Sequence, residues 1–187
     1  SVGLAVERVQ RFGNADTFGE IRFSKQFMSG TWGVSAGGAG GAHFLPEAAV
    51  RFEYATREDM DTTFDVALTI ARYRAGQIDR LALRARRQVA APLQLNATGI
   101  LVRDETRELR SGFGVGAVWS ASSWMLVDAS WVDAPESSEG VTLDVRATSF
   151  GVTTDIRPDL RVRFGVLREG RDAFDRTEVS LSLSRTF

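Results

Sequence analysis

The sequence predicts an all-β chain that folds as one closed, antiparallel, up-and-down β-barrel of about twelve strands. Apolar and polar residues alternate in segments of about ten residues along the whole chain. Short stretches of Gly, Pro, Asn, Asp and Ser separate these segments, as antiparallel hairpins require. The last segment, EVSLSLSRTF, keeps this alternation up to Phe187, where an open sheet would have an unpaired edge.

The bulk composition limits the kind of protein. The 187 residues are enough for one domain, 1–187, and the net charge of -1 does not favour nucleic-acid binding. There is no cysteine, so disulfides and thiolate metal sites are excluded. No apolar run is long enough for a transmembrane helix, and no signal peptide is visible. Of the 23 basic residues only Lys25 is a lysine, and arginine suits internal ion pairs with carboxylates.

The predicted strands follow one another in order along the first half of the chain. They cover residues 2–12, 18–27, 31–40, 47–57, 62–73 and 77–89. Each has one apolar side, formed in turn by Val2, Leu4 and Val6, by Ile21, Phe23 and Phe27, by Trp32, Val34 and Ala36, by Ala48, Val50 and Phe52, by Phe64, Val66 and Leu68, and by Leu81, Leu83 and Ala85.

The second half continues the same pattern. Its predicted strands cover residues 93–103, 109–120, 123–132, 141–153, 160–168 and 178–187. Their apolar sides are formed in turn by Leu93, Leu95 and Ala97, by Phe113, Val115 and Ala117, by Met125, Val127 and Ala129, by Val141, Leu143 and Val145, by Leu160, Val162 and Phe164, and by Val179, Leu181 and Leu183.

Two places break the alternation. Arg8 and Gln10 share the parity of Val6, and a β-bulge after Val6 would restore an apolar side through Val9. Lys25 also falls on an apolar side, where a long side chain near a membrane edge could extend toward water.

Three further features indicate that the apolar side faces lipid and the polar side a lumen. The strand lengths suit a tilted strand that crosses a bilayer. The polar side mixes acids with arginines, as an internal ion-pair network does. Aromatic residues near strand ends are typical of interfacial girdles, and the candidates are Trp32, Tyr54, Trp119 and Trp131. The sequence therefore predicts a transmembrane barrel with a polar lumen, while a soluble barrel or sandwich with apolar walls around a ligand is the alternative.

The final segment resembles the β-signal of bacterial outer-membrane barrels. The matching residues are Val179, Leu181, Leu183 and Phe187, and Arg185 departs from the pattern. The stretches SVGLAVERVQRF, TFGEIRFSKQFMSGTW and FLPEAAVRFEYATR are similar to the YaiO-type outer-membrane barrel family, although this chain has only two tyrosines. That resemblance implies a role in the cell envelope or with polysaccharides.

The resemblance also implies a location and partners. The expected location is the Gram-negative outer membrane, and an even number of strands places both termini in the periplasm. The expected partners are outer-membrane lipid, the barrel-assembly machinery during biogenesis, and another envelope protein.

The polar side supplies the candidate lumen residues. They are Glu7, Glu20, Arg22, Arg51, Glu53, Asp65, Arg80, Arg84, Arg86, Asp128, Asp144, Arg146, Arg161, Arg163 and Glu178. Arginines and carboxylates are nearly balanced, which favours a structural network that fills much of the lumen. A selective pore is the alternative: Arg80, Arg84 and Arg86 would form a basic stripe for an anionic solute such as an acidic glycan if they faced Arg161 and Arg163, although the strand count places the two groups far apart.

Catalysis, cofactors and metals are not expected. His43 is the only histidine and falls in a loop, GAHFLP, rather than on a strand beside a nucleophile. The acidic stretches EDMD and DAPESSE lack the ligand spacing of a calcium site, and no helix follows the glycine-rich stretch at 37–42. The expected function is a structural or transport component of the envelope, in surface polysaccharide export or small-solute passage. A scaffold that docks another outer-membrane protein is a further alternative.

Overall fold

The chain forms one sheet of twelve antiparallel strands in which each strand pairs with the next in sequence. The computed structural model describes residues 1–11, 14–57, 61–171 and 174–186. The strands are β1 Val2–Arg11, β2 Asn14–Phe27, β3 Gly30–Gly40, β4 Ala48–Thr56, β5 Thr62–Arg72, β6 Gln77–Ala90, β7 Leu93–Arg103, β8 Leu109–Ser122, β9 Met125–Ser138, β10 Val141–Arg157, β11 Leu160–Arg171 and β12 Phe174–Arg185. The predicted all-β, up-and-down fold class is confirmed.

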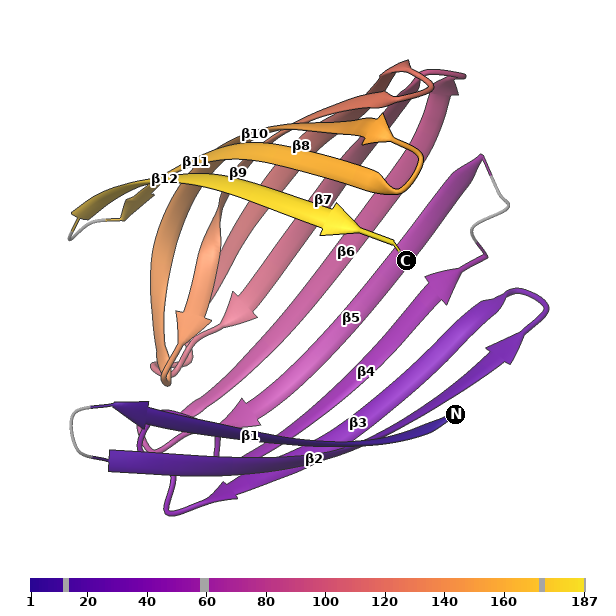
Figure 1. Cartoon of the computed structure of the whole chain (residues 1–187). Coiled ribbons are helices and arrows are strands. Elements are labelled where there is room, and N and C mark those ends of the chain that lie inside the picture. The colour runs from indigo at the N-terminus through magenta and orange to yellow at the C-terminus, as the bar shows by residue number, and fades with distance from the viewer. Residues whose placement is uncertain (12–13, 58–60, 172–173, 187) are drawn as a thin grey trace.

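The sheet curls so that its first and last strands come round to the same side (Figure 1). Between the described residues of β1 and β12 the structure has no ladder of hydrogen bonds, so these two strands form the seam. The start of β1 and the end of β12 lie at one end of the barrel, which we call the terminus end. The opposite end carries the connections β1–β2, β3–β4, β5–β6, β7–β8, β9–β10 and β11–β12, and we call it the loop end.

The ladder registers define the two faces of the sheet, because residues paired across strands point to the same side. One continuous row runs Phe52, Leu68, Leu81 and Leu101 across β4 to β7, and the next row runs Arg51, Thr69, Arg80 and Val102. The first row lies on the outer face and its members remain partly exposed, with Phe52 47% accessible. A large exposed apolar surface of this kind is typical of contact with lipid rather than water.

The inner face is not polar throughout. Near the loop end, a buried cluster of Ile78, Ile100, Val102 and Ala134 fills the space between β6, β7 and β9. Tyr73 and Val132 pack against it, and Val102 has no accessible surface. One wall of the interior is therefore dry at this end, which the sequence pattern did not predict.

The β9–β10 hairpin bends across the loop end toward the β5–β6 connection (Figure 1). Glu139 and Gly140 form its turn and both have positive φ, as a tight hairpin of this kind requires. A Cβ on Gly140 would lie 2.8 Å from the Cβ of Tyr73, so only glycine allows this approach. The hairpin tip thus covers part of the mouth.

Several predicted boundaries and one predicted bulge were wrong. β2 begins at Asn14 instead of 18, and β9, β10 and β11 extend several residues beyond their predicted ends. β1 has an unbroken register with β2, so no bulge follows Val6, and Arg8 pairs with Thr17 on the outer face. On the outer face of β1, Arg8 comes directly after the last apolar residue, Val6, in the direction of the loop end. Near that end polar side chains replace apolar ones on the outer face of several strands. Lys25 lies on the outer face as predicted, and its Nζ is 5.1 Å from the centre of the Phe27 ring.

Among the described residues, no helix is long and apolar enough to cross a membrane.

Candidate functional site: the lumen of the barrel

A cavity of about 590 Å³ lies on the inner face and is lined by residues from β2 to β9. A cavity bounded by so many successive strands can only be the interior of the barrel. Its charged lining consists of Arg22, Arg51, Glu53, Asp65, Arg80 and Arg84. The structure therefore brings together six of the predicted lumen residues, which come from the four strands β2, β4, β5 and β6.

Both carboxylates of this cavity are engaged by arginines. Glu53 lies 2.5 Å from Arg51, and Asp65 lies 3.1 Å from Arg86. Arg22 lies 3.4 Å from Glu20 on its own strand. These contacts neutralise the acids that line the cavity.

Arg80 and Arg84 are different, because no carboxylate among the described residues lies within ion-pair distance of either one. The register on the neighbouring strand β5 is part of the reason. It places the uncharged Thr69 opposite Arg80, and it places Asp65 opposite Arg84. The Arg86 guanidinium, not that of Arg84, takes the Asp65 carboxylate. The cavity consequently has two positive charges that are not neutralised locally, on a wall that remains open to solvent.

The opposite wall, from β9 to β12, is extensively paired. Arg163 lies 2.9 Å from Asp128, Arg161 lies 2.6 Å from Asp155, and Arg176 contacts Glu178. Arg171 bridges Glu136, at 2.7 Å, and Glu169, at 2.6 Å. Two of these contacts skip a strand, so they hold the curvature of this wall as well as neutralise it.

Arg161 and Arg163 line a second cavity, of about 530 Å³, near the terminus end. Arg80 and Arg84 do not contribute to it. The two groups of arginines are therefore not brought together, and the basic stripe is confined to β6.

Two predicted lumen residues lie elsewhere. Arg146 pairs in register with Asp133 on the face that carries Trp131, and their side chains are 2.8 Å apart. Asp144 shares that parity and contacts Arg110, at 3.5 Å, in the loop-end network.

The reason is that the apolar side of β10 changes along the strand. Val145 and Ala147 have one parity, Phe150 and Val152 have the other, and the register with β9 is continuous from 141 to 154. One half of β10 must therefore turn apolar side chains inward, and the buried Val145 belongs to that half.

The inner face also contains residues that the sequence reading missed. Glu136, Glu169 and Arg171 lie beyond the predicted strand ends, where the alternation is no longer visible. The inward-facing Ile100 and Val102 did leave a signal, because they continue the polar parity of Asn96 and Thr98 with apolar residues. Glu7 and Glu20 are on β1 and β2, away from the unpaired arginines.

The four aromatic residues predicted at the interfaces all lie on the outer face. Trp32 and Tyr54 stack near the terminus end, with ring centres 4.6 Å apart, and Trp119 is near the same end of β8. Trp131 lies farther toward the loop end, next to Phe113 at 5.1 Å, and the following outer residue on its strand is Asp133. These positions border the apolar band on two sides.

Three residues of the predicted assembly signal are on the outer face of β12. Val179, Leu181 and Leu183 pair with Val166, Phe164 and Val162, and each is more than 60% accessible. Phe187 lies outside the described residues.

Asp16 anchors the β3–β4 connection to β2. Its buried carboxylate accepts the backbone N–H groups of His43, Phe44 and Leu45 at 2.6 to 2.9 Å. The His43 ring lies 3.1 Å from the same carboxylate through Nδ1. This arrangement fixes a loop, and no group of three or more metal-ligating side chains occurs in the part of the chain that the structure describes.

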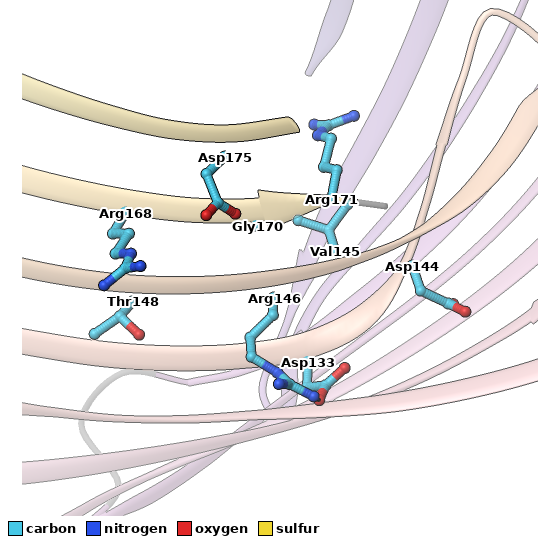
Figure 2. Close-up of a pocket in the computed structure, with 9 residues that line it drawn as sticks. All are labelled: Asp133, Asp144, Val145, Arg146, Thr148, Arg168, Gly170, Arg171 and Asp175. Carbon is cyan, nitrogen blue, oxygen red and sulfur yellow. The ribbon is translucent and has the colours of Figure 1, made fainter. Parts of the chain in front are cut away.

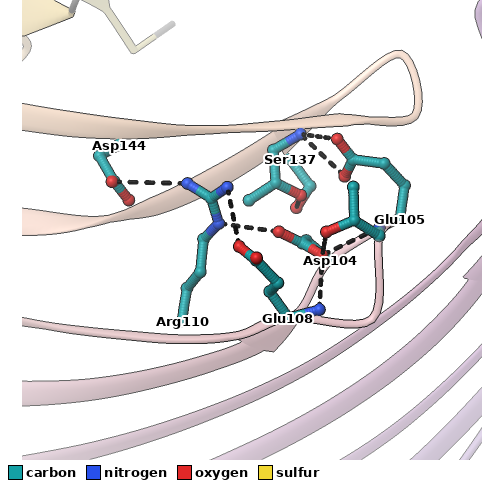
Figure 3. A network of polar contacts seen from close by, with 8 residues as sticks. Asp104, Glu105, Glu108, Arg110, Ser137 and Asp144 are labelled. Carbon is teal, nitrogen blue, oxygen red and sulfur yellow. Dashed lines mark hydrogen bonds and ion pairs between the residues drawn. The ribbon is translucent and has the colours of Figure 1, made fainter.

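Asp104 organises the β7–β8 connection in the same way (Figure 3). It accepts hydrogen bonds from the N–H and hydroxyl of Thr106, the N–H of Glu108 and the Arg110 guanidinium, at 2.7 to 2.9 Å. The adjacent Glu105 accepts the N–H of Thr142 at 3.1 Å, which links this loop to the β9–β10 hairpin. The hydrogen bond from Thr106, together with those from Arg110 and Glu108, lowers the pKa of Asp104 from 3.8 to about 2 against the effect of burial.

We expect this loop to depend on the charge of Asp104. Because the folded-state pKa is depressed, the charged carboxylate stabilises the fold fully above the unfolded value near 3.8, and the effect is lost as the pH falls through about 2. The melting temperature of Asp104→Asn should therefore lie below that of the wild type at pH 7, and the difference should shrink only below about pH 4. Thermal unfolding followed by circular dichroism measures this. Glu108→Gln, whose exposed carboxylate lies 3.9 Å from the same Arg110, controls for the loss of one negative charge beside that guanidinium. A difference that has already vanished at pH 5 would contradict the prediction.

No family model matches the chain, and no curated protein matches it. Solved structures, in contrast, match the chain. The KdgM porin matches over 100% of this chain and 96% of that chain, with a TM-score of 0.53 and 7% sequence identity. The chain has a porin fold. The NanC porin matches over 100% of this chain and 99% of its own, with a TM-score of 0.51 and 9% identity. At such identities the likeness concerns the fold alone, and it extends over 100% of this chain and at least 96% of each porin chain.

Proposed function

We propose that the protein is an outer-membrane channel that passes small anionic solutes, with acidic saccharides as the substrate class. The observation that carries this proposal is the pair Arg80 and Arg84, unneutralised in a water-accessible cavity inside a porin fold. Guanidinium groups bind carboxylates in a bidentate manner, and a lumen with unneutralised charge of one sign favours ions of the other sign.

The membrane setting is part of the proposal. The outer face contacts lipid, the residues Trp32, Tyr54, Trp119 and Trp131 lie at its borders, and both termini are periplasmic. The segment with Val179, Leu181, Leu183 and Phe187 serves as the signal for the barrel-assembly machinery. The YaiO-type resemblance and a role in polysaccharide export rest on the sequence stretches alone. A scaffold role with another envelope protein has no specific support.

The test is the ion preference of the purified protein in a planar lipid bilayer. With a tenfold gradient of KCl across the bilayer, the reversal potential should have the sign of an anion-preferring channel, and galacturonate or another acidic sugar should reduce the chloride current. A neutral sugar of the same size serves as control. Absence of conductance, or a preference for potassium, would refute the proposal.

A further inference from the structure

The outer face of β10 and β11 carries a compact set of hydrogen-bond donors just beyond the apolar band. Thr148 pairs directly with Arg168, and Arg146 lies two residues along β10 from Thr148. Directly opposite residues and their diagonal neighbours are about 5 to 8 Å apart, so the three side chains can converge on one group. Figure 2 shows Thr148 beside Arg168 in a pocket of about 500 Å³. The next outer residues toward the terminus end are Phe150 and Val166, so the set lies at the level expected of lipid headgroups.

The charges of this pocket leave donors available. Asp133 accepts hydrogen bonds from Nε and Nη2 of Arg146, which orients this guanidinium and leaves Nη1 free. Arg168 has no ion-pair partner among the described residues. Asp144 is engaged by Arg110, and Asp175 also lines the pocket. One oriented guanidinium, one unpaired guanidinium and the Thr148 hydroxyl form a donor set that matches the oxygens of a phosphate.

An apolar groove continues from this pocket along the same outer face. It has a volume of about 770 Å³, crosses β6 to β10 and reaches Thr148, which lines both spaces. The register places the small residues Ala97, Ala117 and Ala129 on the outer face of the sheet, where they line the groove between Leu95 and Trp131. The surface therefore has an anion-binding end and an apolar channel that meet at one residue. This is the shape of an amphiphile with an acidic headgroup.

We propose that this face binds a phosphate-bearing lipid of the leaflet at the loop end. The phosphate accepts hydrogen bonds from Arg146, Thr148 and Arg168, and one acyl chain lies in the groove. A free phosphate would need only the polar pocket, whereas the continuous groove and its level on the barrel favour the lipid. The proposal rests on the membrane setting described under the proposed function, but not on the ion preference of the lumen.

The test compares lipid retention by detergent-purified variants. The wild type and Arg146→Gln/Arg168→Gln are incubated with diphosphoryl lipid A or its dephosphorylated form, and bound lipid is counted by native mass spectrometry. The double variant should bind diphosphoryl lipid A about tenfold or more weakly, since it loses charge-assisted hydrogen bonds. Arg72→Gln/Arg103→Gln is the matched control, because these arginines lie on the outer face at the loop end of other strands and each has a carboxylate 3.7 Å away.

A second pair of variants tests the groove. Ala117→Phe should fill it and weaken lipid binding, while Ala36→Phe, on the outer face of β3, should not. Equal binding by all variants, or equal binding of the phosphorylated and dephosphorylated lipids, would overturn the proposal. A third result would also overturn it: the arginine variant loses lipid binding, Ala117→Phe keeps it, and inorganic phosphate displaces the lipid. The site would then be a simple anion site. A chain that stays soluble without detergent would instead refute the membrane setting itself.

Discussion

Replacing both Arg80 and Arg84 with glutamate should turn an anion-preferring channel into a cation-preferring one. These two guanidinium groups are the unneutralised charges of the inner cavity, and the double substitution changes the charge there by four units. At an effective dielectric constant near 20, a unit charge about 12 Å away contributes about 1.4 kcal/mol, so each reversed charge alters the relative permeability by more than about tenfold. Reversal potentials in a KCl gradient measure the change.

Two variants make this result specific. Arg80→Gln/Arg84→Gln should give an intermediate, nearly unselective channel, because it removes the excess charge without reversing it. Arg72→Glu/Arg103→Glu makes the same change of charge on the outer face and should leave the selectivity close to that of the wild type. If the outer pair altered selectivity as much as the inner pair, the current would not pass through the cavity between β2 and β9.

The second large effect depends on which face of the sheet contacts lipid and which faces the lumen. Val66 and Ala67 are neighbours near the middle of β5, and the register places Val66 outward beside Tyr54 and Leu83, and Ala67 inward beside Glu53 and Ala82. An arginine on the lipid side near the bilayer midplane costs about 2–4 kcal/mol, whereas lumen positions tolerate charge. Val66→Arg should therefore destabilise the barrel by that amount, and Ala67→Arg should change stability little.

Urea unfolding in lipid vesicles, followed by tryptophan fluorescence and by gel mobility of unheated samples, gives the two stabilities. Both variants place one new arginine at adjacent positions of the same strand, so their net charge is matched. The opposite order, with Ala67→Arg the more damaging, would mean that the apolar residues face a protein interior.

The sequence predicts this fold well where one face of a strand meets lipid, because an unbroken apolar environment enforces a period of two. All twelve strands were identifiable for that reason. Strand ends at the loop end were not, since polar residues such as Asp133 and Arg168 interrupt the outer row there, while the inner face carries the apolar cluster around Val102. The long β9 and β11 show this most clearly.

The site was less predictable, because alternation assigns a face but not a partner. The sequence identified Arg80 and Arg84 as candidates, yet the nearly equal numbers of acids and bases suggested a neutral lumen. The register places Asp65 opposite Arg84, and only the side-chain contacts show that Asp65 is taken by Arg86. Arg146 was misplaced because the apolar side of β10 changes between Ala147 and Phe150 without a bulge, and such a change is invisible unless the neighbouring strands are known.

The uneven distribution of charge around the wall has a consequence for anything that enters the cavity. Guanidinium groups without local partners project from β6, while Glu136, on β9, is paired with Arg171. The electric field in this region must therefore have a component perpendicular to the barrel axis. Water molecules and dipolar solutes would align across the passage rather than along it, so a molecule with its acidic and hydroxyl groups on opposite edges would be turned edge-on as it crosses.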